Sequence, residues 1–234
     1  LAQGAAITQD FSLKPSGALG WGEGYVTNIL NGTRINGAVV KVGDKTVVTQ
    51  RRPGSDSGYS SSHGYYIIYG IAPGSYTLET AKEGYFTRAS NALGVDFNAE
   101  SRMDVSLTPE GTPAMNLTGV VKNLLNGSPL SKAKVWIGAS VVVLGGDDGV
   151  YTITNLPVGK NYDLYASKSG YRERLINSLP LMGIAGQSLT QNIALTPDSV
   201  EVKSIQGFIV NALSGANLDG VKVSLGDGMV RHTT

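Results

Sequence analysis

The chain has no cysteine among its 234 residues. Disulfide bonds, cysteine-based zinc sites and thiol nucleophiles are therefore all excluded. Charged side chains are also scarce, at 16%, and the net charge is only +1. A field of that size does not attract nucleic acid, and the basic doublet Arg51-Arg52 is interpreted as part of a solvated loop. No apolar run approaches the roughly 18 residues of a membrane span, so we expect no membrane insertion.

Helical patterns are missing as well. The longest candidate, residues 179–189, contains Pro180, Gly183 and Gly186 and would form a poor helix. Instead, 31 glycines together with Asn, Ser and Pro separate short runs rich in Val, Ile and Tyr. This arrangement is typical of an all-β chain with many turns. The chain starts without Met and without a signal-peptide pattern, so we expect its start to be processed or cut.

An internal repeat is the strongest feature of the sequence. Gly-Tyr-Val-Thr-Asn at 24–28 recurs as Gly-Val-Val-Lys-Asn at 119–123 and as Gly-Phe-Ile-Val-Asn at 207–211. The spacings are 95 residues (119 − 24) and 88 residues (207 − 119). A period of this length indicates one folded unit per repeat.

The last strand of the unit recurs too. Met-Asp-Val-Ser-Leu-Thr-Pro at 103–109 matches Gln-Asn-Ile-Ala-Leu-Thr-Pro at 191–197, and residues 7–15 show the same pattern. The chain is therefore expected to begin on the last strand of one repeat and to stop within the first half of another. The predicted boundaries are 1–18 for that last strand, 19–111 and 112–200 for two complete repeats, and 201–234 for the first strands of a further repeat.

Alternation along the second strand of each repeat assigns its two faces, since successive side chains of a strand point in opposite directions. The positions predicted to face the core are Ala38, Val40 and Val42, then Ala133, Val135 and Ile137, then Val221, Val223 and Leu225. Lys41, Trp136 and Ser224 are predicted to point outward. Units of about 90 residues with such strands predict tandem Greek-key β-sandwiches.

The order of these motifs resembles the carboxypeptidase regulatory-like family, which is similar in fold to transthyretin and to the B-type repeats of collagen-adhesin stalks. The motifs that carry the resemblance are the Gly-containing first strand, the Ala-x-Val-x-Val/Ile-Gly second strand, the Gly-x-Tyr-x-Ile strand and the later Gly-Tyr pair at 84–85 and 170–171. The resemblance covers both complete repeats and implies a transthyretin-like or immunoglobulin-like sandwich. The Tyr/Ser-rich insertion at 55–66 departs from it.

Aromatic side chains give a candidate for carbohydrate binding. Trp136 stands on an outward face where the other repeats have Lys41 and Ser224, and Tyr59, Tyr65, Tyr66 and Tyr69 crowd together in the first repeat. Exposed rings bind the faces of sugars. The competing interpretation is that these rings pack across strands or beneath a loop.

Metal and catalytic chemistry have little support. Asp147-Asp148 is a candidate for calcium, but an ordinary Asx turn is favoured because a calcium loop needs six or more oxygens. The two histidines, His63 and His232, have no metal-ligand spacing, and no serine triad is identifiable. We therefore predict no enzyme, no cofactor and no metal.

Stalk repeats of the kind resembled here use self-made isopeptide bonds, which need a Lys on the first strand and a Glu on a later one. Glu79 is on such a later strand, but the first strand of its repeat has Thr27. The next repeat has Lys122, with Tyr165 at the position of Glu79. No isopeptide bond is predicted, since a Lys without its carboxylate is not activated this way.

The sequence thus predicts a non-catalytic structural or adhesive region, a spacer, stalk or fibre subunit, of a secreted or cell-surface protein from a bacterium or archaeon. Expected partners are neighbouring repeats of the same chain, joined by short Pro-containing linkers such as 108–113, and other chains through edge strands. Two alternatives remain: a polysaccharide-binding module that uses exposed aromatics, and an accessory domain of a larger secreted enzyme.

Overall fold

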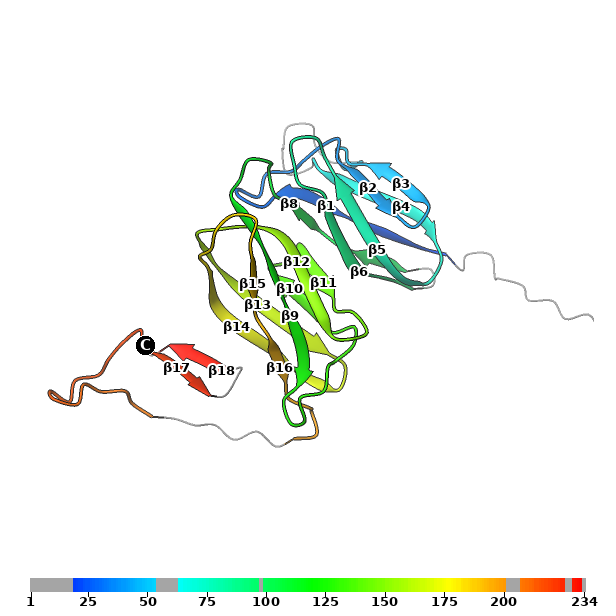
Figure 1. Ribbon diagram of the computed structural model, residues 1–234. Helices are drawn as coiled ribbons and strands as arrows, with labels where there is room; N and C mark the ends of the chain where they lie inside the picture. Colours follow the sequence, from blue (N-terminus) through cyan, green and yellow to red (C-terminus); the bar gives the residue numbers. More distant parts are fainter. Residues whose placement is uncertain (1–18, 54–62, 97–98, 201–206, 226–228, 233–234) are drawn as a thin grey trace, which may run out of the picture.

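The computed structural model of the chain describes residues 19–53, 63–96, 99–200, 207–225 and 229–232. Every regular element in these ranges is a β-strand, which confirms the all-β class (Figure 1). Among the described residues no helix is long and apolar enough to cross a membrane. The predicted strand at 7–15 lies outside the described residues.

The first β-sandwich consists of two four-stranded sheets. In one sheet the central strand β1 pairs antiparallel with β4 and parallel with β7 and β8. The other sheet has the order β3-β2-β5-β6. The strands of the first sheet are β1 (Gly20–Asn28), β4 (Tyr65–Ile71), β7 (Glu100–Arg102) and β8 (Val105–Leu107). Those of the second sheet are β2 (Val39–Val42), β3 (Lys45–Val48), β5 (Gly74–Ala81) and β6 (Arg88–Val95).

The second β-sandwich has the same strand order. Its central strand β9 pairs antiparallel with β12 and parallel with β15 and β16, and the other sheet is β11-β10-β13-β14. The strands of its first sheet are β9 (Ala114–Asn123), β12 (Val150–Pro157), β15 (Ser188–Thr190) and β16 (Ile193–Leu195). Those of its second sheet are β10 (Lys134–Ile137), β11 (Val141–Leu144), β13 (Lys160–Lys168) and β14 (Tyr171–Leu181).

Each sandwich has its own core between its two sheets. In the first, Val40 and Val42 are buried while Val39 and Lys41 of the same strand are exposed. The second repeats this on β10, where Ala133 and Val135 are fully buried and Ile137 packs against the same cluster. The faces predicted from alternation are therefore correct in both sandwiches.

The two sandwiches also match in detail at the middle of their first sheets. Tyr66 Oη donates a hydrogen bond to the carbonyl of Met103 at 2.6 Å, and Tyr151 Oη donates to the carbonyl of Gln191 at the same distance. Beside each tyrosine is a glycine, Gly24 or Gly119, where a side chain would collide with that same carbonyl. Glycine is required at these two positions because the backbone of the last strand crosses there.

The C-terminal part forms a hairpin of β17 (Lys222–Leu225) and β18 (Met229–His232). Val223, predicted to face a core, is 42% exposed. That prediction is not met, because the hairpin has no second sheet packed on it among the described residues. A strand can bury its apolar face only when another layer covers it.

Candidate functional site

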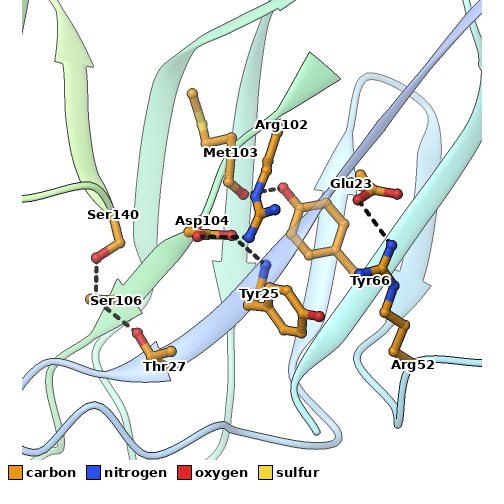
Figure 2. A network of polar contacts seen from close by, with 10 residues as sticks. All are labelled: Glu23, Tyr25, Thr27, Arg52, Tyr66, Arg102, Met103, Asp104, Ser106 and Ser140. Carbon is orange, nitrogen blue, oxygen red and sulfur yellow. Dashed lines mark hydrogen bonds and ion pairs between the residues drawn. The ribbon is translucent and has the colours of Figure 1, made fainter. Parts of the chain in front are cut away.

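The junction between the two sandwiches is made by hydrogen bonds from one to the other. Ser106 of β8 donates its N–H to the carbonyl of Ser140 at 3.0 Å, and the two hydroxyls lie 2.6 Å apart. Thr108, just after β8, donates its hydroxyl to the carbonyl of Asn155 at 2.5 Å. Figure 2 shows the first of these contacts as a line from Thr27 through Ser106 to Ser140. The two units are thus in contact through specific polar groups as well as through the connecting chain.

Arg88, at the start of β6, is buried in this junction. Its side chain is 4% exposed, and its Nε donates to the carbonyl of Ser106 at 2.6 Å. Its Nη2 lies 3.5 Å from the carbonyl of Asn155, across the junction. Burial lowers the pKa of this guanidinium to about 10, an effect that the nearby Tyr162 partly opposes. Burying a cation is costly unless it is hydrogen-bonded, so Arg88 fixes the two carbonyls in place.

Apolar contacts complete the junction. Strand β6 of the first sandwich lies beside β11 of the second. Val142 of β11 points away from its own core and is nevertheless buried. Ile29, which follows β1, packs against the core of the second sandwich. Since β6 and β11 are each at the edge of a sheet, the junction covers two of the edges that the sequence predicted as sites of association.

The sequence contained signals for the junction that its interpretation missed. Ser140 is in a turn of three residues, 138–140, where the first repeat has two, 43–44. Asn155 has a φ of 54°, an uncommon value outside glycine, and Gly70 is its counterpart in the first repeat with a φ of 71°. The longer turn and the positive φ can be explained only once the first sandwich is seen to contact Ser140 and Asn155.

A second polar cluster lies on the outer face of the first sandwich. Glu23 of β1 is 8% exposed and accepts a hydrogen bond from Tyr65 Oη at 2.7 Å. Arg52 is 4.0 Å from the same carboxylate, as Figure 2 shows. Burial and the bond to Glu23 both raise the pKa of Tyr65. The tyrosine therefore stays protonated and serves as a hydrogen-bond donor.

Tyr25, next to this pair, is covered by arginine. The guanidinium carbon of Arg34 lies 3.6 Å from the centre of its ring, and that of Arg102 lies 5.5 Å away. Asp104 accepts the backbone N–H of Tyr25 at 2.9 Å and pairs with Arg102 at 3.5 Å. The charged side chains of this cluster thus pair with each other or lie over the tyrosine rings. These contacts stabilise the outer face of the first sandwich.

Two of the tyrosines predicted as part of a sugar-binding surface, Tyr65 and Tyr66, are not available for it. Tyr65 and Tyr66 are both buried, so neither offers a ring face to a ligand. They are buried because Tyr66 points into the core and Tyr65 is held against Glu23 and Tyr25. Tyr59 lies outside the described residues. Tyr69, on the same strand, is exposed.

Trp136 points outward, as predicted, and stacks on Tyr165 of the neighbouring strand. The ring centres are 5.3 Å apart and the planes differ by 11°. Lys134 lies 5.2 Å from the centre of the tryptophan ring. In the first sandwich the same paired positions are Lys41 and Glu79. One face of Trp136 is therefore occupied by a cross-strand partner.

The remaining candidates take ordinary roles in the described part of the chain. Asp148 accepts the backbone N–H of Val150 at 3.0 Å as in an Asx turn, and Asp147 lies exposed, 3.8 Å from Lys132. Among the described residues no group of three or more His, Asp or Glu lies close enough together to hold a metal ion. Glu79 is exposed.

The positions relevant to an isopeptide bond hold other groups. Thr27 faces Ser106, with the hydroxyls 2.9 Å apart, and Lys122 is paired in register with Ala194. The acceptor side chain of an isopeptide bond would be an Asn or Asp at such a last-strand position. Serine and alanine offer no carboxyl or amide carbon there.

Comparison with known families agrees with the fold. Residues 116–196, which make up most of the second sandwich, match the model of the carboxypeptidase regulatory-like domain. The resemblance read from the sequence is confirmed for the second sandwich by this match. No curated protein sequence matches the chain.

Solved structures similar to the chain include the Bacillus anthracis TIE protein and two pilins. The Bacillus anthracis TIE protein is 14% identical, with 77% of this chain and 34% of that chain covered and a TM-score of 0.29. A streptococcal ancillary pilin is 15% identical over 80% of this chain and 65% of its own, with a TM-score of 0.26. The minor pilin of Streptococcus agalactiae is 11% identical over 80% and 99%, with a TM-score of 0.27. The chain thus spans about a third of the TIE protein and less than two thirds of the streptococcal ancillary pilin. Its role is therefore argued below from its own residues.

Proposed function

We propose, on the premise that the chain is built from carboxypeptidase regulatory-like sandwiches, that it is a non-catalytic structural or adhesive repeat region, a spacer, stalk or fibre subunit, of a secreted or cell-surface bacterial or archaeal protein. The observation that carries the proposal is the buried, hydrogen-bonded junction around Arg88. A junction that buries a guanidinium and fixes two carbonyls resists bending. A stiff array of sandwiches suits a protein that holds another part away from a surface.

The linker between the sandwiches supports the same conclusion. On one side, Glu110 donates its N–H to the carbonyl of Gly84 at 2.9 Å. On the other, the carbonyl of Pro113 accepts the N–H of Val158 at 3.0 Å. The two prolines, Pro109 and Pro113, restrict φ at both ends of the connection. The connection is therefore short, hydrogen-bonded to both units and stiff.

The alternative of a polysaccharide-binding module has weaker support. A sugar would need a free aromatic face, whereas Trp136 is stacked on Tyr165 and Tyr65 is buried. The accessory-domain alternative differs from our proposal only in what lies elsewhere in a longer protein. In both cases the role of these two sandwiches would be to set a distance and an orientation.

Small-angle X-ray scattering of residues 1–234 tests the proposal, with Arg88→Ala as the variant and Arg172→Ala, an exposed arginine of β14, as the control. The expected result is one elongated arrangement of the two sandwiches that loosens in Arg88→Ala and is unchanged in Arg172→Ala. If the unsubstituted chain already behaves as two freely jointed bodies, a stiff spacer is contradicted. Binding of a polysaccharide panel that is lost in Trp136→Ala would favour the carbohydrate-binding alternative.

A further inference from the structure

Three asparagines of the chain are followed by a residue other than proline and then by a hydroxyl side chain. They are Asn31 before Thr33, Asn116 before Thr118, and Asn126 before Ser128. This spacing is the acceptor sequence for N-linked saccharide, which is attached to the side-chain nitrogen Nδ2 of the asparagine. Because such a short pattern is frequent by chance, the surroundings of each asparagine decide whether it can accept a saccharide.

Two of the three asparagines hold the same place in the two sandwiches. Asn31 is in the turn after β1, and Asn126 is in the turn after β9. In both turns the next residue, Gly32 or Gly127, donates its N–H to the carbonyl four residues earlier, at 2.8 Å and 2.9 Å. The two glycines have nearly equal φ values, 72° and 71°. In the C-terminal segment Ser214 takes this place, so the acceptor is present in the two sandwiches and absent from the third copy of the turn.

Both turns are open to solvent. Asn31 and Asn126 are exposed, and so is the residue on either side of each. A Cβ placed on Gly32 or on Gly127 would meet no other heavy atom within 4 Å. An attached saccharide is bulky and solvated. It can therefore be accommodated at these two turns without displacing a packed group.

The hydroxyl of each of these two acceptor sequences is bonded to its own asparagine. Oδ1 of Asn31 accepts the hydroxyl of Thr33 at 2.8 Å and its N–H at 3.0 Å. Oδ1 of Asn126 accepts the hydroxyl of Ser128 at 2.7 Å and its N–H at 3.0 Å. These bonds occupy the oxygen of the amide and leave its nitrogen, a donor on the other side of the planar group, for reaction.

Asn116 lacks all of these features. It is half-buried within β9, which has a strand on either side. Its Oδ1 accepts the N–H of Asn155 at 3.1 Å, and the hydroxyl of Thr118 donates to the carbonyl of Tyr151 at 2.9 Å. A saccharide on Asn116 would disturb the contact that holds Asn155, whose carbonyl accepts Thr108 across the junction.

We propose that Asn31 and Asn126 are sites of N-linked saccharide and that Asn116 is not. In the reaction, Nδ2 attacks the anomeric carbon of a saccharide carried on a polyprenyl pyrophosphate. The bond from that carbon to the pyrophosphate oxygen breaks, and the pyrophosphate leaves with the bonding electron pair. Nδ2 gives up one proton to a base of the membrane transferase, so the product is a neutral amide with a new bond from nitrogen to carbon.

A saccharide on Asn31 would lie beside the junction. Ile29, two residues earlier, packs against the core of the second sandwich, whereas Asn31 itself is exposed. The saccharide on Asn126 would hold the same place on the second sandwich. The inference goes beyond the proposed function and shares with it only a location outside the cytoplasm, where such transferases act.

Glycosylation in vitro tests this assignment. Folded residues 1–234 are incubated with a purified transferase that accepts Asn-x-Ser/Thr and with a polyprenyl-pyrophosphate oligosaccharide, and peptide mass spectrometry measures the saccharide on each asparagine. Thr33→Ala and Ser128→Ala each remove the hydroxyl of one site, and Thr33→Ser, which keeps it, is the matched control. A synthetic peptide of residues 112–122 presents Asn116 outside its sheet.

In the folded chain we expect Asn31 and Asn126 to be modified about tenfold or more faster than Asn116, because β9 must open before Asn116 can react. Each alanine variant should lose its own site and keep the other, and the peptide of 112–122 should be modified. Absence of saccharide from both Asn31 and Asn126 while the peptide reacts, or equal rates at all three asparagines, would overturn the proposal.

The protein isolated from its own source gives the second measurement. Its peptides that contain Asn31 and Asn126 are expected to carry the added mass of a saccharide, and recovery of only the bare peptides would contradict the assignment. Scattering measures the stiffness of the junction on the chain without saccharide. A failure of the stiff spacer is therefore seen separately from a failure of these two sites.

Discussion

The carbonyl of Asn155 in the second sandwich accepts the hydroxyl of Thr108 in the first, at 2.5 Å. The donor follows the last strand of one unit, and the acceptor is a residue with positive φ in the other. The carbonyl is presented to the first unit because the backbone turns at Asn155. This pair makes the junction directional: the end of one unit fits the start of the next.

Thr108→Val tests the pair, since it removes the hydroxyl and keeps the shape. Thr108 is fully buried, so the substitution leaves an acceptor without its donor, and we expect a loss of about 1–2 kcal/mol in the free energy of unfolding. Chemical denaturation measures it. Thr152→Val is the matched control, because Thr152 is exposed and shares a longer contact, 3.2 Å, with Thr118. Equal effects of the two substitutions would mean that the junction bond contributes nothing.

The buried carboxylate on the outer face gives a second prediction. Tyr65→Phe removes the hydroxyl that donates to Glu23 and leaves that carboxylate with one fewer partner. We expect a loss of about 1–3 kcal/mol in the free energy of unfolding. Tyr69→Phe, at an exposed tyrosine of the same strand, should be neutral. If Glu23→Gln restores the stability of Tyr65→Phe, the cost is that of the charge and not of the lost packing.

The aromatic pair of the second sandwich can be exchanged for the two oppositely charged residues that hold the same cross-strand positions in the first. Trp136→Lys and Tyr165→Glu together would reproduce Lys41 and Glu79, which hold the same register. Each single substitution should lower the free energy of unfolding by about 1–2 kcal/mol through loss of the stack. The double variant should recover about 0.5–1 kcal/mol of the combined loss through the new cross-strand pair. Strictly additive losses in a double-mutant cycle would contradict this equivalence.

Stability should decline in alkali. Burial raises the pKa of Tyr162 to about 12, from the ordinary value of 10.0, and raises the pKa values of Tyr66 and Tyr151 as well. A pKa that is higher in the folded state stabilises the fold fully below pH 10 and loses that contribution as the pH rises through the folded value. Arg88 acts in the opposite direction: its pKa, lowered to about 10 from 12.5, adds stability as the pH rises between those values. Urea denaturation between pH 8 and pH 11.5 should show a net decline, and Arg88→Met should make it steeper; a flat profile would contradict the tyrosine effect.

Much of the fold could be predicted from the sequence because it depends on local patterns. The repeated glycine of the first strand, Gly24 and Gly119, marks where the last strand crosses, and the alternation around Val40 and Val135 gives the core face. The boundaries of a longer series of repeats stay a prediction. The exposed position of Val223 is the exception, since the pattern indicates a face but not whether anything covers it.

The candidate site could not be predicted in the same way. Tyr65 alternates like an outward residue, and it does point outward, but Glu23 and Tyr25 hold it in a buried layer on that face. Arg88 looks like any surface arginine of a strand until the second sandwich is placed against it. Both cases concern contacts between segments far apart in the chain, which a single repeat does not encode.

The stiffness of the junction is tested most directly by the distance between two spin labels, one on each sandwich. Thr46→Cys on β3 and Ser169→Cys in the turn after β13 are exposed and lie away from the junction, and the chain has no other cysteine. Pulsed electron paramagnetic resonance should give one narrow distance distribution, which becomes broad when Arg88→Ala and Thr108→Ala are introduced together. A broad distribution before those changes would show that the sandwiches move independently, and the chain would then not be a stiff spacer.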